Sequence, residues 1–199
     1  MSAQNEVVYG RWREDKEAVP GFSKELISAD YDMYIKNETS VDELYALPFP
    51  GENTILKSLM RLKNTIGDRD FLGTRVGDHY EWRTVTETMD EAHYLSLGFK
   101  ALGLIPDIEA EGRSWRFMGI QAKNRAEWAI TSFAGMHQKT TIIGMYDTLG
   151  PDAVRFIVNQ TKMTSIAIAP EYIKKLCQIK LDDHDGKMST LANLVVFED

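Results

Sequence analysis

One stretch of the sequence, residues 116–146, constrains the fold more than any other. It reads RFMGIQAKNRAEWAITSFAGMHQKTTIIGMY. Two apolar runs, 117–122 and 140–146, have the length of buried strands, and the segment between them has helical length. A strand, a crossover helix and a second strand form a βαβ unit, in which the strands are parallel and the connection is almost always right-handed. The stretch therefore predicts a parallel sheet.

The helix of this unit begins with a predicted capping box. Asn124 stands three residues before Glu127. The Asn124 side-chain oxygen can therefore accept a hydrogen bond from the first turn, and the Glu127 carboxylate can accept one from the Asn124 amide. Behind this cap, apolar residues leave little of the helix polar, which indicates that it packs between other elements.

The sequence after Tyr146 repeats the same alternation. Pro151 is typical of a helix start, because the N–H that proline lacks would be unpaired there, and it predicts a helix over 151–160. A strand over 164–169, a helix over 171–179 and a strand over 193–197 follow. The order from residue 117 is β-α-β-α-β-α-β. We therefore predict an α/β fold with a partial doubly wound parallel sheet flanked by helices.

The sequence before residue 116 contains further local signals. Ile55, Leu59, Leu62 and Ile66 form one apolar stripe, which predicts a helix from about residue 53 to 65. Two strands, 71–76 and 80–84, joined by residues 77–79, predict a hairpin. Thr84-Val85-Thr86-Glu87 is a capping box that opens a helix ending at Gly103. The polar, acidic residues 106–114 predict a loop.

The first 52 residues differ from the rest and predict an irregular N-terminal arm. They mix charges with scattered aromatic residues, and Pro48-Phe49-Pro50-Gly51 is a strong breaker. We therefore expect an arm over 1–52 and a core domain over 53–199. The arm either lies on the surface of the domain or forms a partly disordered tail. Its aromatic residues are Tyr9, Trp12, Phe22, Tyr31 and Tyr34.

Composition excludes several classes of function. The chain has 23 Lys and Arg against 30 Asp and Glu, a net charge of −7, and no basic stripe, which argues against a nucleic-acid partner. The single cysteine, Cys177, cannot form an internal disulfide, as in proteins of reducing compartments. The sequence has neither a secretory apolar segment nor a run of membrane-spanning length. We therefore expect an intracellular, soluble domain.

Ligands of a doubly wound sheet bind beyond the carboxyl ends of strands, where the strand order reverses. Here those ends are Lys123-Asn124, Tyr146-Asp147-Thr148 and Ala169-Pro170. None of them carries a glycine-rich phosphate-binding motif. Tyr146, Asp147 and Thr148 are the candidates for lining a cleft; the alternative is that they form only a loop that leads into a helix.

No pattern in the sequence amounts to a self-sufficient active site or metal site. Residues 182–185 (DDHD) combine carboxylates with an imidazole, but consecutive residues rarely converge on one ion and no acidic partner follows at calcium-loop spacing. We therefore predict a solvated loop. No nucleophile, base and orienting group connect His79, His93 and His137. Cys177 has no basic cluster to activate it. We predict no catalytic residue and no metal ligand.

Several segments resemble one enzyme family. MGIQAKNRAEW is similar to the GI-x-A-x-NRPEW segment of eukaryotic long-chain acyl-CoA synthetases, with Ala126 in the place of proline. GMYDTLGPDAVRFIVNQT resembles their LYDTLG segment, and FPGENTILKSLMRLKNTIGDRDFLGTR resembles the start of the same domain. The similarity runs in order from about residue 48 to 197, although 109–116 is more charged than in the family. The chain is thus identified as resembling the N-terminal portion of these enzymes, which belong to the adenylate-forming, AMP-binding superfamily.

The resemblance implies a two-step reaction. A fatty acid carboxylate attacks the α-phosphorus of Mg·ATP to give an acyl-adenylate and pyrophosphate, and the thiolate of coenzyme A then displaces AMP. The family's phosphate loop, adenine-binding stretch, acidic ribose ligand and C-terminal lysine do not occur in these 199 residues. We therefore expect that this segment alone binds no cofactor and is not catalytic, and that ATP, Mg²⁺ and coenzyme A belong to the complete enzyme. The matching positions are signatures of the scaffold.

Three functions remain open at this point. The chain is the N-terminal part of a long-chain fatty acid–CoA ligase, a structural or assembly subunit of such descent, or a small ligand-binding module, although the last lacks a phosphate loop. In the first two, the remainder of the synthetase or a protein partner covers the open sheet edge, since an uncovered edge promotes aggregation. The resemblance implies a place on the cytoplasmic side, with peripheral association with the endoplasmic reticulum or another organelle membrane and no transmembrane segment.

Overall fold

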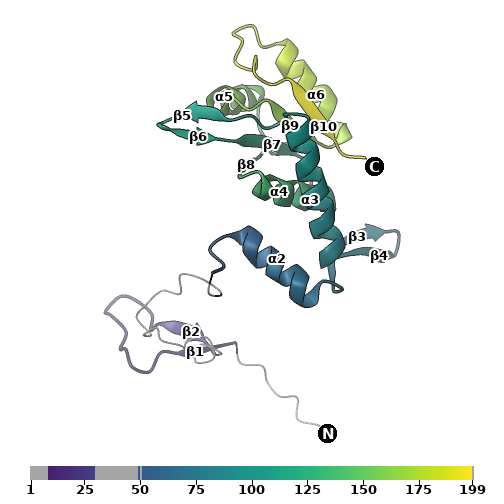
Figure 1. The fold of residues 1–199 in the computed structure, drawn as a ribbon. Helices are drawn as coiled ribbons and strands as arrows, with labels where there is room; N and C mark the ends of the chain where they lie inside the picture. Colours follow the sequence, from purple (N-terminus) through teal and green to yellow (C-terminus); the bar gives the residue numbers. More distant parts are fainter. Residues whose placement is uncertain (1–8, 30–48, 50, 199) are drawn as a thin grey trace. The chain divides into compact units, whose positions relative to one another are not determined.

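The computed structural model describes residues 9–29, 49 and 51–198 (Figure 1). Contacts within the chain divide it into two compact units, Met1–Asn53 and Thr54–Asp199. Each unit is therefore described by itself. Two aromatic residues of the predicted arm, Tyr31 and Tyr34, lie outside the described residues.

The first unit contains a small antiparallel pair that the predicted irregular arm did not include. Strand β1 (Gly10–Trp12) pairs with β2 (Leu26–Ser28), with Trp12 opposite Leu26. Next to β1, the buried side chain of Arg13 donates hydrogen bonds to Asp15 at 2.9 Å and to Glu25 at 3.2 Å. These carboxylates compensate the charge of the buried guanidinium. Strands of three residues are too short to show an alternating pattern in the sequence.

The second unit is built around a four-stranded parallel sheet. Its strands are β7 (Phe117–Gln121), β8 (Thr141–Gly144), β9 (Ser165–Ile168) and β10 (Asn193–Val196). They lie in the order β10-β9-β7-β8, and all three pairings are parallel. The predicted α/β fold with a partial doubly wound sheet is confirmed.

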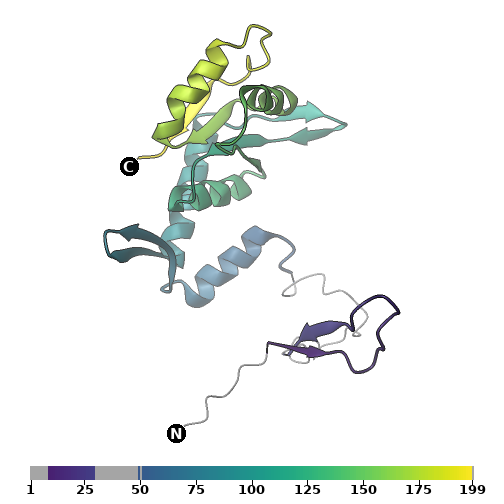
Figure 2. The same ribbon diagram turned by 180° about the vertical axis from the view of Figure 1, so that it is seen from behind.

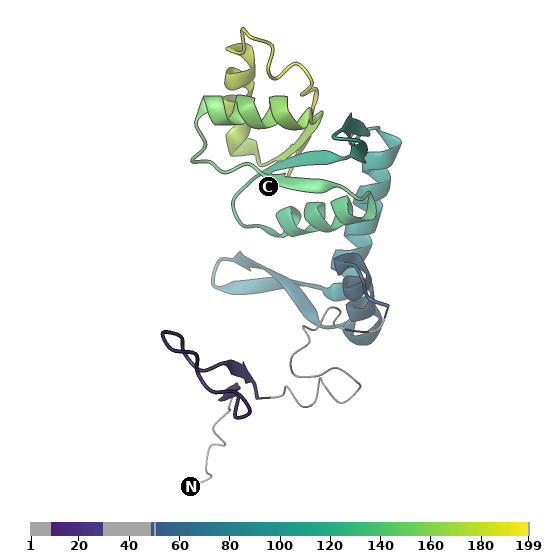
Figure 3. The same cartoon turned by 90° about the vertical axis from the view of Figure 1, so that its left-hand side faces the viewer.

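Helices cover both faces of this sheet. The chain adds β8 on one side of β7 and β9 on the other, so right-handed connections place the intervening helices on opposite faces. Figure 3 shows α4 (Ala126–His137) and α5 (Pro151–Thr161) on the two sides of the sheet. Two core clusters follow from this arrangement. One includes buried side chains of α5 and α6 (Pro170–Leu181), and the other includes buried side chains of α4 and α3 (Val85–Ala101).

The predicted capping box at the start of α3 is confirmed. The Thr84 hydroxyl accepts a hydrogen bond from the Glu87 amide at 3.2 Å, and the Glu87 carboxylate accepts one from the Thr84 amide at 2.8 Å. Two donors of the first turn are thereby satisfied. The prediction that Pro151 opens a helix is confirmed as well, since it is the first residue of α5.

The capping box predicted at Asn124 is wrong. The N-cap of α4 is Arg125, and no side chain caps this helix. The Glu127 carboxylate, which was expected to bond the Asn124 amide, instead accepts a hydrogen bond from Arg125 Nε at 2.7 Å. A charged guanidinium is a stronger partner for a carboxylate than a backbone amide is. The helix therefore begins one residue later than the sequence indicated.

The sequence predicted one of the two hairpins described in this unit and missed the other. Strands β3 (Asp70–Val76) and β4 (His79–Thr84) form the predicted hairpin, with His79 in the strand rather than in the turn. The loop predicted over 106–114 is wrong, because β5 (Ile108–Ala110) and β6 (Arg113–Trp115) form a second hairpin. Figure 2 shows this hairpin extending away from the sheet.

The turn of the second hairpin explains why it forms. Glu111 and Gly112 both have positive φ angles, 55° and 73°, as a tight two-residue hairpin turn requires. The Arg113 guanidinium stacks over the Trp115 ring at 3.5 Å, and Trp115 stacks on Phe117 with ring centroids 5.5 Å apart. These contacts stabilise strands whose three residues give no periodic signal.

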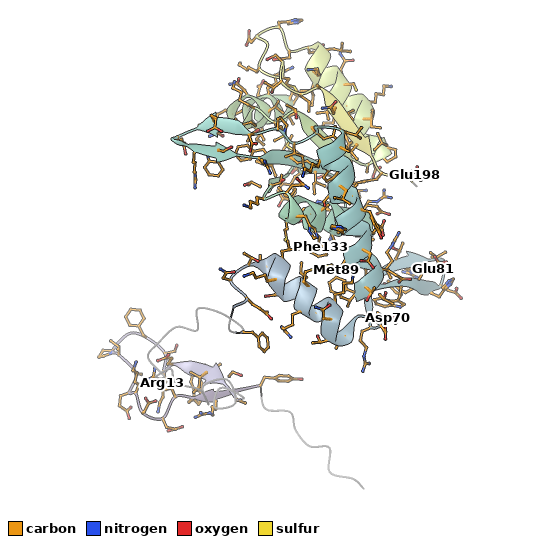
Figure 4. All side chains as sticks on the ribbon, in the orientation of Figure 1. Arg13, Asp70, Glu81, Met89, Phe133 and Glu198 are labelled. Carbon is orange, nitrogen blue, oxygen red and sulfur yellow. The ribbon has the colours of Figure 1, made fainter. Side chains whose placement is uncertain are left out.

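Helix α2 (Ile55–Ile66) lies against α3, to which the Lys63–Asp90 ion pair connects it. The predicted stripe is not fully covered within the described residues, since Ile55 is 67% exposed and Ile66 is 44% exposed. Phe133 lies on the side of α4 that faces α2 (Figure 4), and its ring stacks on Phe71 with centroids 6.3 Å apart.

Candidate functional site

A pocket of about 620 Å³ lies at the carboxyl ends of β7 and β8. The chain leaves β7 to add β8 on one side and returns to add β9 on the other, so the strand order reverses at β7. Open α/β sheets bind their ligands at this kind of position. The pocket is lined by Ile120, Ala122, Lys123, Asn124, Trp128, Gly144, Met145, Tyr146, Asp147 and Tyr172.

Three aromatic side chains form much of the pocket wall. Trp128 stands in the first turn of α4, and Tyr172 stands in the first turn of α6. Both pack against the core cluster that holds Ile120, which fixes their positions. Tyr146 is 71% exposed and its ring lies beside Gly144, where an added Cβ would meet it at 3.8 Å. Three aromatic rings therefore adjoin the pocket.

The polar groups of the pocket come from the loops that follow the strands. Lys123 and Asn124 are exposed at the end of β7, and Asp147 is exposed after β8. The Asp147 carbonyl accepts a hydrogen bond from Lys175 Nζ at 3.0 Å, which ties this loop to α6. Helix α4 follows β7 and α6 follows β9, so both helices begin at the carboxyl ends of the strands, and neither has a side-chain cap. The positive ends of two helix dipoles therefore lie at the carboxyl end of the sheet.

An ion pair stands directly beside the pocket. Arg125, between the lining residues Asn124 and Trp128, donates from Nε to Glu127 at 2.7 Å and from Nη2 to the Glu198 carbonyl at 2.7 Å. Burial by itself raises the pKa of the Glu127 carboxyl. The hydrogen bond from Arg125, together with the charges of Arg125 and Arg83, outweighs burial and holds this pKa below its ordinary value. Glu127 is therefore a paired carboxylate.

The structure brings together some of the residues that the sequence singled out. Lys123, Asn124, Tyr146 and Asp147 line the pocket, whereas Thr148 does not. Ala169 and Pro170 begin α6 without lining it. Trp128 and Tyr172 were missed as wall residues. Their positions in the first turns after β7 and β9 were the available signal, but it becomes informative only when the strand order is known.

The other candidate residues have local partners. Asp185 pairs with Lys187 at 3.0 Å, and Asp183 accepts a hydrogen bond from the Met188 amide at 2.6 Å. His79 lies 3.5 Å from Asp78 on the exposed hairpin. No cluster of three or more metal-ligating side chains occurs among residues 9–29, 49 and 51–198. Cys177 is exposed on α6.

Two histidines that appeared unconnected in the sequence are neighbours in the structure. His93 of α3 and His137 of α4 meet edge to face, with ring centroids 5.2 Å apart. Burial lowers the pKa of His137, and the nearby His93 lowers it further. The pair is a contact between α3 and α4.

The lining of the pocket presents groups that are suited to binding a ligand. It offers aromatic faces, one lysine, one asparagine and one aspartate. Among the described residues, no helix is both long enough and apolar enough to cross a membrane.

Comparison with solved structures identifies the fold of the core unit. The adenylation domain of the carboxylate reductase from Mycobacterium chelonae aligns with a TM-score of 0.63 at 20% identity, over 77% of this chain and 24% of that one. The anthranilate CoA ligase AuaEII, in complex with anthranoyl-AMP, aligns with a TM-score of 0.58 at 19% identity, over 71% and 24%. The core unit therefore has the fold of the N-terminal domain of adenylate-forming enzymes. No protein-family model matches the chain.

Comparison with curated sequences finds similarity to long-chain acyl-CoA synthetases. Long-chain-fatty-acid–CoA ligase 1 of Cavia porcellus is 32% identical over 135 residues, 64% of this chain and 17% of that protein. The peroxisomal long chain acyl-CoA synthetase 6 of Arabidopsis thaliana is 36% identical over 115 residues, 55% and 15%. The chain is a relative of the long-chain acyl-CoA synthetases, as the sequence motifs indicated. It spans between 12% and 19% of the length of the curated relatives compared.

Proposed function

We propose that this chain forms the beginning of the N-terminal domain of a long-chain fatty acid–CoA ligase. The observation that carries the proposal is the colinear similarity to such ligases, combined with a pocket at the point where the strand order reverses. The complete ligase activates a fatty acid through an acyl-adenylate and then forms the thioester with coenzyme A. Mg²⁺ and positively charged groups offset the charge on the phosphates during the first step.

Within this reaction, the pocket takes part in holding an adenine nucleotide, the unit that ATP and coenzyme A share. The rings of Trp128, Tyr146 and Tyr172 are suited to stacking on a flat heterocycle. Lys123 and the uncapped first turns of α4 and α6 favour an anionic phosphate group at the same edge.

Acyl-CoA formation requires groups outside these 199 residues. The sequence has no phosphate loop, so the groups that hold the phosphates of ATP come from elsewhere in the ligase. Strands β8 and β10 are the two edges of the sheet, each paired on one side only within the described part of the core. We propose that the remainder of a synthetase chain covers at least one of them. The unpaired edges equally suit an assembly subunit whose protein partner covers them.

Two measurements test this function. The first is the intact mass of the endogenous polypeptide, captured through an epitope in the core unit. A mass several-fold above that of the 199 residues supports the ligase, whereas a mass equal to it, with a co-purifying partner, supports the assembly subunit. The second is release of AMP and pyrophosphate by the purified 199-residue chain with palmitate, Mg·ATP and coenzyme A. Turnover by this chain alone contradicts the proposal that acyl-CoA formation requires groups outside these 199 residues.

The pocket is tested separately by nucleotide binding. NMR titration of the purified chain with ATP and with coenzyme A should shift resonances of the lining residues. Tyr146→Ala should weaken this response. Tyr94→Ala is the matched control, because Tyr94 is 69% exposed on α3 and Tyr146 is 71% exposed in the pocket. Equal binding by both variants rules out Tyr146 as part of the nucleotide site.

A further inference from the structure

Arg125 connects two segments that lie far apart in the sequence. Its Nε donates to the Glu127 carboxylate in the first turn of α4 at 2.7 Å. Its Nη2 donates at 2.7 Å to the carbonyl of Glu198, which is 73 residues away and follows β10. The guanidinium carbon also lies 5.5 Å from the centroid of the Phe197 ring. Figure 4 shows Glu198 at the exit from the sheet.

The geometry of these contacts requires arginine. The planar guanidinium donates from two nitrogens to two different acceptors, one charged and one neutral, while its face lies near an aromatic ring. The ammonium group of lysine is a single point and cannot hold the same arrangement. The side chains of Arg125 and Glu127 are only 23% and 30% exposed, so water screens this pair less than it screens a surface ion pair.

The bridge adjoins the walls of the pocket. Arg125 is the N-cap residue of α4, and its carbonyl accepts a hydrogen bond from the Trp128 amide at 3.2 Å. Phe197 is 6% exposed and belongs to the same core cluster as Trp128 and Tyr172. A change in the position of Phe197 therefore disturbs the cluster against which two wall residues pack.

We propose that Arg125 is a positioning residue that fixes the first turn of α4 to the exit of β10 and thereby sets the position of the pocket wall. The inference rests on the proposed function only in taking this pocket as a nucleotide site. The bridge holds Trp128 on one side and Phe197 on the other. Phe197 and Glu198 are consequently held next to the first turn of α4.

The experiment uses the complete 199-residue chain and the Arg125→Lys variant. Hydrogen exchange reports on the Phe197 amide, which donates to the Ile168 carbonyl at 3.0 Å. It should exchange roughly tenfold faster in the variant, as expected for loss of one charge-assisted hydrogen bond. The indole N–H resonance of Trp128 should move. The pKa of Glu127, followed by NMR, should rise, because Arg125 no longer stabilises the charged carboxylate.

Two further variants separate positioning from general stability. Arg155→Lys is the matched control, because Arg155 also bridges elements, donating to Asp152 and to the carbonyls of Ile179 and Asp182 on the opposite face of the sheet. It should lower stability but leave the Phe197 exchange and the Trp128 resonance unchanged. Glu127→Gln removes only the contact within α4. It should move the Trp128 resonance and leave the exchange of Phe197 close to that of the wild type.

Each result has a defined meaning. Unchanged Phe197 exchange and an unchanged Trp128 resonance in Arg125→Lys overturn the inference, as do changes of equal size in Arg155→Lys. These readouts need no ligand, so they remain decisive even when the wild-type chain binds neither ATP nor coenzyme A and the proposed function fails. Where the wild type does bind a nucleotide, Arg125→Lys should weaken that binding about tenfold, as expected for a displaced wall.

Discussion

Gly119 at the centre of β7 is a position where the structure leaves little room for a larger residue. It is paired on both sides, opposite Ile143 of β8 and Ile166 of β9. A Cβ added to Gly119 would lie 2.8 Å from Ile166 Cγ1, 3.2 Å from Met163 Sδ and 3.5 Å from Met145 Cγ. The first distance is far below van der Waals contact, so Gly119→Ala forces a neighbour to move.

The cost of Gly119→Ala follows from which atoms must move. Ile166 is fully buried in β9, and its branched Cβ leaves little rotamer freedom for Cγ1. Overpacking of this kind costs about 1–3 kcal/mol. Alanine recovers about 0.5–1 kcal/mol because it restricts the unfolded chain more than glycine does. We expect a net loss of about 1–2 kcal/mol, which lowers the melting temperature by roughly 2–8 °C for a domain of this size.

Gly98→Ala is the matched control for this prediction. Gly98 stands inside α3, and a Cβ added there meets nothing within 4 Å. The same substitution should therefore stabilise the chain by about 0.5–1 kcal/mol, the helix propensity difference. Urea denaturation and thermal melting measure both variants. The reasoning is refuted when Gly119→Ala is as stable as the wild type while Gly98→Ala shows its expected gain.

Three further variants test other contacts. Thr84→Ala should lose about 1 kcal/mol in urea denaturation, because it removes half of a capping box, and an unchanged midpoint contradicts that cap. Arg155→Ala should lose about 1–3 kcal/mol, because it removes the guanidinium that donates to the carbonyls of Ile179 and Asp182 at the end of α6; equal stability shows that water replaces it. Burial and His93 lower the pKa of His137, so the folded chain takes up this proton at a lower pH than the unfolded chain, whose histidine has the ordinary pKa of about 6.5. The contribution of His137 to the free energy of unfolding is therefore complete above pH 6.5 and is lost as the pH falls towards the depressed folded pKa. His137→Gln should make the free energy of unfolding depend less on pH between about pH 7.5 and about pH 5.5. An equal slope of this free energy against pH in both proteins contradicts the prediction.

Features that depend on a few consecutive residues were predicted correctly. The capping box of Thr84 and Glu87 forms within one turn, so no distant residue is needed to specify it. Pro151 opens α5 because its ring fixes the local backbone. The alternation of apolar strands with helical segments predicted the parallel sheet, because each segment was long enough to show its period.

Features that depend on distant partners or on very short strands were missed. The capping box at Asn124 looked as strong as the one at Thr84, but Arg125 takes the Glu127 carboxylate and also reaches Glu198. The strands of the β5–β6 hairpin have three residues each, and stacking of Trp115 on Arg113 and Phe117 holds them in place. The contact between Arg125 and Glu198 spans 73 residues, and three-residue strands are too short to show a period in the sequence.

The sequence by itself determined the elements of the core, their parallel pairing and the relation to long-chain acyl-CoA synthetases. Each of these three features depends on residues that are close together in the chain. The tertiary structure alone decided the strand order β10-β9-β7-β8, and with it the pocket. Trp128 and Tyr172 became wall residues only because β7 and β9 are neighbours and place the first turns of α4 and α6 at the same edge of the sheet. Burial of apolar surface on both faces of the sheet selects that order, and this is a property of the whole core rather than of any segment.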